Sequence, residues 1–284
     1  MKTIASSTVP DQAEQDRIRS VQQLAYDTAE GVARDLRPGV TERQAAARLR
    51  RRLIEEGVDD WFHLPFAWFG DRTTLQAMGR NPLRFFPTSR RLEEGMPYIL
   101  DVAPVRGGFT ADIGYSGCLG SNPIFDQMMS DLGEYRTLIL DRVRERRTFA
   151  DIYDEVDRLA AKHGYTPAHH VYPGKVLAHQ VWPVHNPGPR TIVAGFGNRS
   201  LRLLARSLRV AAGEGWSPLW NGSRRSDHIP VPGIWAIEPH LGFQDVGVKF
   251  EEIMVVTEDD AYWLDDDLPH VHRWRNANAD SVVA

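Results

Sequence analysis

The feature that most constrains the fold is a pair of carboxylates placed inside apolar sequence. The stretch ILDVAPVRGGFTADIGYSG, residues 99–117, carries Asp101 and Asp112 in two apolar runs that flank a Gly-Gly turn. An unpaired buried charge is costly, so strands of this composition need a compensating partner for each carboxylate. A hairpin that turns at Arg106-Gly107 places Asp101 directly opposite Asp112 on one face of the ladder. The pattern predicts two facing carboxylates with a proton or a cation between them.

A second acidic pair lies nearer the C-terminus, in GIWAIEPHLGFQDVGVKFEEIMVVTEDD, residues 233–260. A hairpin that turns at Gln244-Asp245 places Glu238 opposite Glu251. One such pair is as compatible with a structural role as with a functional one, whereas two pairs favour a metal site. Hard divalent cations with oxygen ligands compensate such charge, and two ions bridged by carboxylates and a water are the economical arrangement.

A histidine is expected to complete the ligand set. The candidate is His179, at the end of the short apolar run in YPGKVLAHQVWPVHNPG, and the nearby alternatives are His169, His170 and His185. A single buried histidine is more often a satisfied core residue. The assignment of His179 therefore depends on the carboxylates.

The chain repeats a helical pattern. Apolar residues at helical spacing predict a long helix over residues 11–36, and Thr41 and Gly57 delimit a second. The segment VRERRTFADIYDEVDRLAAKHGY can be laid over LRPGVTERQAAARLRRRLIEEGV without gaps, which places Thr148 on Thr41 and Gly164 on Gly57. We infer a diverged internal duplication in which helices precede strands, and hence an α+β fold.

This organisation divides the chain into three parts. We expect a flexible N-terminal arm over 1–13, a single domain over 14–265 with an Arg-rich insertion at 186–233, and a poorly ordered polar tail over 266–284. Within the insertion, NRSLRLLARSLRV predicts a helix with a leucine face and a basic face. The leucines are Leu201, Leu204 and Leu208, and the arginines are Arg199, Arg202, Arg206 and Arg209. A solvated surface is the favoured role of the basic face, and a lid over an acidic substrate or a subunit contact is the alternative.

Composition excludes several classes of protein. The formal charge of -4 offers no global attraction to nucleic acid or to an anionic membrane, and the single cysteine excludes an intrachain disulfide. No apolar run is long enough to span a bilayer, and the first residues lack the apolar segment of a secretory signal. We expect a cytoplasmic protein that binds neither nucleic acid nor membrane.

The acidic motifs resemble those of the pita-bread metallopeptidases, which include methionine aminopeptidase, Xaa-Pro aminopeptidase, prolidase and the non-peptidase creatinase. Residues 99–117 resemble the first metal motif, GIWAIEPHLG the Ile-Glu-Pro motif, and GVKFEEIMVVTED the closing Gly-Val-Arg-Ile-Glu-Asp motif. VLAHQVW is similar to the Gly-His-Gly motif, and the short step between the two glutamates resembles the prolidase and creatinase branch. The resemblance covers about residues 14–265 and implies duplicated helices, related by a pseudo-twofold, packed on a curved antiparallel sheet.

The resemblance also implies a site. Its metal ligands are Asp101, Asp112, His179, Glu238 and Glu251. Asp112 and Glu251 would bridge two divalent ions of manganese, cobalt, iron or zinc, while Asp101 holds one ion and His179 and Glu238 the other. A water between the ions would attack a carbonyl carbon while Glu238 moves protons, so catalytic roles are expected for Glu238, His179 and His185. The expected substrate is a small molecule or short peptide, and the expected assembly is a homodimer.

Three departures from the family pattern leave the substrate open. RNPLRFFPTSRRLEEGMP lacks the histidine with which peptidase members contact substrate, and His63 lies too far upstream to be assigned to that role. Lys175 stands where proline-specific members have a histidine, and His185 comes one residue early. The leading hypothesis is a binuclear hydrolase of the Xaa-Pro aminopeptidase or dipeptidase type. The alternatives are a non-peptidase acting on a small amidine, amide or metabolite, and a catalytically silent binding protein.

Overall fold

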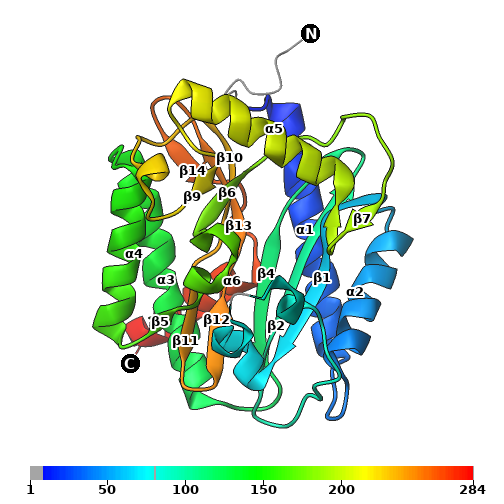
Figure 1. Ribbon diagram of the computed structural model, residues 1–284. Coiled ribbons are helices and arrows are strands. Elements are labelled where there is room, and N and C mark those ends of the chain that lie inside the picture. The colour runs from blue at the N-terminus through cyan, green and yellow to red at the C-terminus, as the bar shows by residue number, and fades with distance from the viewer. Residues whose placement is uncertain (1–8, 80, 284) are drawn as a thin grey trace.

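Two pairs of helices flank a set of antiparallel strands in the computed structural model, which describes residues 9–79 and 81–283 (Figure 1). In this view α1 and α2 lie on one side, α3 and α4 lie on the other, and α5 crosses one end of the molecule. The helices are α1 (Gln12–Arg34), α2 (Glu42–Glu55), α3 (Pro123–Arg144), α4 (Phe149–His163), α5 (Asn198–Glu214) and α6 (Pro269–Val283).

The capping residues explain where the helices of the duplicated pattern begin and end. Thr41 caps α2 and Thr148 caps α4, each through a side-chain oxygen that accepts a hydrogen bond from a backbone N–H in the first turn. At the other end of α4, Gly164 adopts the left-handed conformation that a helix C-terminus favours. The predicted boundaries of these two helices are confirmed.

Two strands, β1 and β2, are ten residues long, the other strands are shorter, and the described strands pair antiparallel. They are β1 (Asp60–Phe69), β2 (Pro97–Arg106), β3 (Phe109–Thr110), β4 (Ile113–Cys118), β5 (Thr166–Pro167), β6 (Ala178–Val181), β7 (Ile192–Val193), β8 (Phe196–Gly197), β9 (Leu219–Trp220), β10 (Gly233–Ile237), β11 (His240–Phe243), β12 (Val246–Lys249), β13 (Glu252–Val256) and β14 (Ala261–Trp263). Within the described ranges they form a six-stranded sheet around β2 and β1, a five-stranded sheet around β10, and a three-stranded sheet of β12, β11 and β5.

The two larger sheets repeat one arrangement of three strands. In the first half β2 lies between β1 and β4, and in the second half β10 lies between β6 and β13. The helix pairs belong to two cores: α1 and α2 pack with the first sheet and with one face of β10 and β13, whereas α3 and α4 pack with the other face of the second sheet and with β11 and β12. An isolated bridge between Gly114 and Glu251 joins the halves beside the acidic pairs. The predicted α+β architecture is confirmed.

The ends of the chain differ in part from expectation. Most of the predicted arm, residues 1–8, lies outside the described residues, and α1 already begins at Gln12. The prediction of a poorly ordered tail is wrong, because residues 269–283 form α6. His270 of this helix lies 3.1 Å from the Glu252 carboxylate, and the Trp274 indole donates to the Met129 carbonyl. These long-range contacts hold α6 against the domain.

The insertion forms the predicted helix, α5, but with a different buried face. Its buried residues are Ser200, Leu203, Ser207 and Ala211, whereas the predicted leucine face is only half-buried. Arg199 is not solvated either, since its guanidinium pairs with buried Asp60 at 3.1 Å. None of the described helices is both long and apolar enough to cross a membrane.

Candidate metal centre

Four carboxylates from both halves converge at the predicted centre. Asp101 lies on β2, Asp112 in the break between β3 and β4, Glu238 directly after β10, and Glu251 between β12 and β13. All four side chains are buried, with at most 7% of any residue exposed. Burial of so much negative charge requires cations close by.

The two hairpins differ in how well their registers were predicted. The second hairpin pairs His240 with Lys249 and Phe243 with Val246, which is the predicted register around Gln244-Asp245. The predicted register of the first hairpin is wrong by two residues, because Asp101 pairs with Gly114. Its turn residues are Gly107 and Gly108, both at positive φ, a conformation that a two-residue hairpin turn demands and that arginine resists. A shift of two residues keeps both aspartates on the same face.

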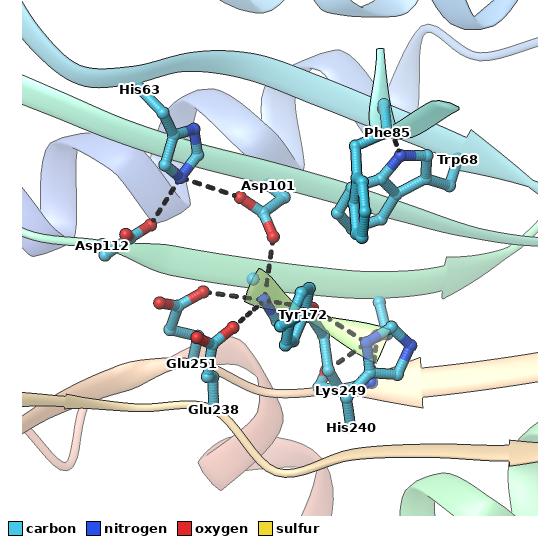
Figure 2. Close-up of polar contacts among 12 residues, drawn as sticks. His63, Trp68, Phe85, Asp101, Asp112, Tyr172, Glu238, His240, Lys249 and Glu251 are labelled. Carbon is cyan, nitrogen blue, oxygen red and sulfur yellow. Dashed lines mark hydrogen bonds and ion pairs between the residues drawn. The ribbon is translucent and has the colours of Figure 1, made fainter. Parts of the chain in front are cut away.

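Lys249 lies in the middle of the cluster (Figure 2). Its Nζ is 2.8 Å from Asp101 Oδ2, 2.9 Å from Glu238 Oε2 and 2.8 Å from Glu251 Oε2, and the side chain is fully buried. Burial alone would lower the pKa of Lys249, but the surrounding carboxylates raise that pKa well above its usual value. Lys249 is therefore an ammonium ion shared by three carboxylates.

Two histidines face the aspartates. His63 of β1 lies 3.0 Å from Asp112 Oδ1 and 3.2 Å from Asp101 Oδ1, and His179 of β6 lies 3.3 Å from Asp112 Oδ2. Each histidine directs Nδ1 to a backbone carbonyl, that of Leu64 or Gln180, so Nε2 faces the carboxylates. Histidine ligands of metals are commonly oriented in this way.

The pKa values of the two acidic pairs shift in opposite directions. Burial alone would raise the pKa of Asp112, but His63 and His179 lower it, and Lys249 and His63 likewise lower the pKa of Asp101 against the effect of burial. Burial raises the pKa of Glu238 despite the nearby Lys249. Burial also raises the pKa of Glu251 well above its usual value, and the Asp112 and Glu238 carboxylates add to this shift. The glutamate pair is thus less well compensated than the aspartate pair.

The donor set fits a divalent cation. Ligand atoms of Asp112, His179 and Glu251 lie within 4.8 Å of one another, and the same is true of His63, Asp101 and Asp112. Carboxylate oxygens with one imidazole suit manganese, iron, cobalt and zinc. The predicted ligands Asp101, Asp112, His179, Glu238 and Glu251 are all brought together.

A cavity of about 440 Å³ opens beside the centre. Apart from the residues of the centre its walls are largely aromatic and aliphatic, formed by Phe62, Phe66, Trp68, Phe85, Tyr172 and Phe196 among others. Helix α5 contributes Leu201 and Leu204, so two of the three leucines of the predicted face line the cavity. Among the described residues that line the cavity, none is lysine or arginine.

The other histidines of the sequence analysis lie elsewhere. His185, predicted to be catalytic, is exposed and packs edge-on against Phe109 at the first hairpin turn, outside the cavity lining. His169 and His170 instead face Asp157, at 3.3 Å and 2.8 Å. The catalytic role of His185 therefore stays a prediction, and His179 is the histidine of the second half that lies at the centre.

Sequence reasoning missed two members of the cluster. Lys249 could have been found, since residues two apart on an extended segment share a face and Glu251 was already placed there. His63 carried a weaker signal, because β1 has irregular register on both sides of it, which breaks the simple alternation of faces.

Comparison with known proteins identifies the family to which this chain belongs. The model of metallopeptidase family M24 matches residues 16–258. The chain belongs to this family. Membership confirms the resemblance to the pita-bread metallopeptidases and supports the expectation of a metal-dependent hydrolase, while the assignment to the creatinase branch stays a prediction. No curated protein sequence matches this M24 chain.

Solved structures show the same fold. The X-Pro aminopeptidase from Thermotoga maritima MSB8 is 16% identical with a TM-score of 0.62, and the match covers 92% of this chain and 63% of that one. Dipeptidase PepE from Mycobacterium ulcerans is 20% identical with a TM-score of 0.66, and the match covers 92% of this chain and 60% of that one. Methionine aminopeptidase from Rickettsia prowazekii is 13% identical with a TM-score of 0.57, at 90% and 98% coverage. At these identities the likeness establishes the pita-bread fold alone, and this M24 chain spans less than two thirds of the first two proteins.

Proposed function

We propose that this M24 chain is a metal-dependent hydrolase that cleaves the amide bond of a small apolar substrate, with Xaa-Pro dipeptides as the leading class. The supporting observation is that Asp112, His179 and Glu251 lie within 4.8 Å of one another at the wall of an apolar cavity. A bound divalent ion supplies Lewis-acid polarisation of the scissile carbonyl and activation of water.

The side chains around the ion have separate roles in this proposal. Glu238 lines the cavity and has a raised pKa because it is buried, which suits a carboxyl group that takes and returns a proton. Phe66 and Leu204 exclude water and contact the apolar part of the substrate. Lys249 is absent from the cavity lining, so its charge acts on the carboxylates and does not contact substrate.

The cavity also favours a second candidate function. A dipeptide carries a free carboxylate, which ordinarily requires a cationic partner, and no lysine or arginine occurs among the described lining residues. A neutral amide without that carboxylate fits such a wall at lower desolvation cost. The second candidate is therefore hydrolysis of a small neutral amide outside peptide metabolism.

One assay separates these candidates. Purified chain supplied with manganese or cobalt is given Phe-Pro and its matched neutral analogue, N-acetyl-Phe-Pro amide, and product release is followed by chromatography. Faster cleavage of Phe-Pro supports the leading proposal, and faster cleavage of the neutral analogue supports the second. Absence of metal-dependent cleavage across free and blocked dipeptides with apolar side chains would contradict both. The homodimer and the cytoplasmic location remain predictions.

A further inference from the structure

The Lys249 ammonium lies among three buried carboxylates. Three carboxylates, from Asp101, Glu238 and Glu251, place an oxygen within 2.9 Å of Nζ, and these residues come from both halves of the chain. The arrangement resembles the coordination of a cation more than an ordinary pairwise salt bridge. Where the family motif has arginine, this chain has lysine, whose compact ammonium is a point charge rather than a planar fork.

The surroundings are shaped to hold this lysine. A Cβ on Gly114 would lie only 2.4 Å from Lys249 Cε and 2.9 Å from Cδ, so the lysine stem passes over a residue that has no side chain. The Lys249 backbone is anchored on both its N–H and its carbonyl by the Ser116 hydroxyl. Nζ also donates to Tyr172 Oη at 3.1 Å, and that hydroxyl contacts His240. The lysine is fixed at both its backbone and its charged end.

The donors that Lys249 and His63 leave free include one cluster close enough to hold an ion. Lys249 occupies one oxygen each of Asp101, Glu238 and Glu251, and His63 faces the other oxygen of Asp101. The other oxygens of Glu238 and Glu251 accept no hydrogen bond from any described residue. Ligand atoms of Asp112, His179 and Glu251 lie within 4.8 Å of one another, and Glu238 lines the same cavity as these three residues.

We propose that the centre binds a single divalent ion, held by Asp112, His179, Glu238 and Glu251, and that the Lys249 ammonium takes the place of a second ion beside Asp101. This inference deepens the proposed function and rests on its metal site. Asp101 then acts as a positioning residue for Lys249 and His63 and is not a metal ligand. The two-ion expectation drawn from the family resemblance is replaced by one ion and one lysine.

The first test counts ions in the full chain. Protein stripped with a chelator is dialysed against manganese chloride, and bound manganese is measured by elemental mass spectrometry and by electron paramagnetic resonance. We expect one ion per chain with the spectrum of an isolated ion. Two ions per chain, a spin-coupled pair or no bound manganese would overturn the inference.

A second test removes the ammonium. Lys249→Met, prepared with manganese present throughout and checked for folding by circular dichroism, is expected to bind two ions per chain. The matched control is Lys162→Met at an exposed lysine of α4, which is expected to keep one. A folded Lys249→Met protein that still binds one ion would contradict the proposal that Lys249 takes the place of a second ion. If this variant does not fold, the ion count in the unmodified chain still tests the inference.

A third test locates the ion. His179→Ala is expected to lose the bound manganese, whereas His63→Ala is expected to retain it, and the reverse result would overturn the proposed ligands. These counts are independent of hydrolysis. Cleavage of dipeptides by a chain with two ions would refute only the inference, and one bound ion without any hydrolysis would refute only the proposed function.

Discussion

The two acidic pairs of the centre are built alike but neutralised differently. Asp101 and Asp112 in the first half face His63 and His179, and their pKa values are lowered despite burial. Glu238 and Glu251 in the second half share only Lys249 among the described cationic side chains within ion-pair distance, and their pKa values are raised. The difference indicates that the glutamate side still needs positive charge, which is where a divalent ion would stabilise the site most.

The largest expected effect comes from Asp112, the carboxylate that faces both histidines. Asp112→Asn removes a charged ligand, so metal-dependent kcat/KM should fall roughly 1000-fold, because the lost Lewis-acid stabilisation is worth several kcal/mol. Steady-state kinetics and a metal count check this. The matched control is Asp157→Asn, because Asp157 also faces two histidines but lies outside the centre. Equal losses in the two variants would contradict the proposed site.

A smaller effect is expected at the other aspartate. Asp101→Asn should reduce kcat/KM about 10- to 100-fold and leave the bound ion in place, since Asp101 orients Lys249 and His63 and is not a ligand. Metal content of the purified variant is the deciding measurement. Loss of the ion would show that Asp101 is a metal ligand. The aspartate pair and the glutamate pair would then hold metal in the same way.

A still smaller effect is expected in the cavity wall. Leu204→Ala removes a half-buried apolar contact worth about 1 to 2 kcal/mol, so KM for an apolar substrate should rise roughly tenfold with little change in kcat. Leu208→Ala is the control, since Leu208 is half-buried on the same helix but does not line the cavity. Similar kinetics for the two variants would show that α5 does not contact the substrate.

The smallest effect concerns stability outside the centre. His169 and His170 lower the pKa of Asp157 to about 2, against the opposing effect of burial, from a usual value of 3.8. A carboxyl group with a lowered folded-state pKa stabilises the protein above pH 4, and this contribution is lost as the pH falls toward 2. Asp157→Asn should therefore lower Tm by about 2 °C at pH 6, and the difference should narrow by pH 3. A difference that widens at low pH would show that the ion pair is not its source.

Local physical rules account for what could be predicted from the sequence. Thr41, Thr148 and Gly164 determine helix ends through contacts within one turn, and apolar periodicity determines which helix faces are buried in α1 and α4. Alternation along strands placed Asp101 on the same face as Asp112 and Glu238 on the same face as Glu251, and it did so even though the predicted register of the first hairpin was wrong by two residues. Side-chain direction in a strand depends only on parity, so these predictions hold without knowledge of the tertiary structure.

Only the tertiary structure decided which groups neutralise those carboxylates. Lys249 meets Asp101 across 148 positions of sequence, and His63 meets Asp112 across 49. The Lys249 contact depends on how the two halves dock through the Gly114–Glu251 bridge, and the His63 contact depends on the irregular pairing of β1 with β2. No local pattern encodes either. The sequence by itself determined that each hairpin would carry an acidic pair on one face, because strand parity is local. The choice between a lysine and a metal ion as the counterion depended on packing, because it rests on the few ångströms of space above Gly114.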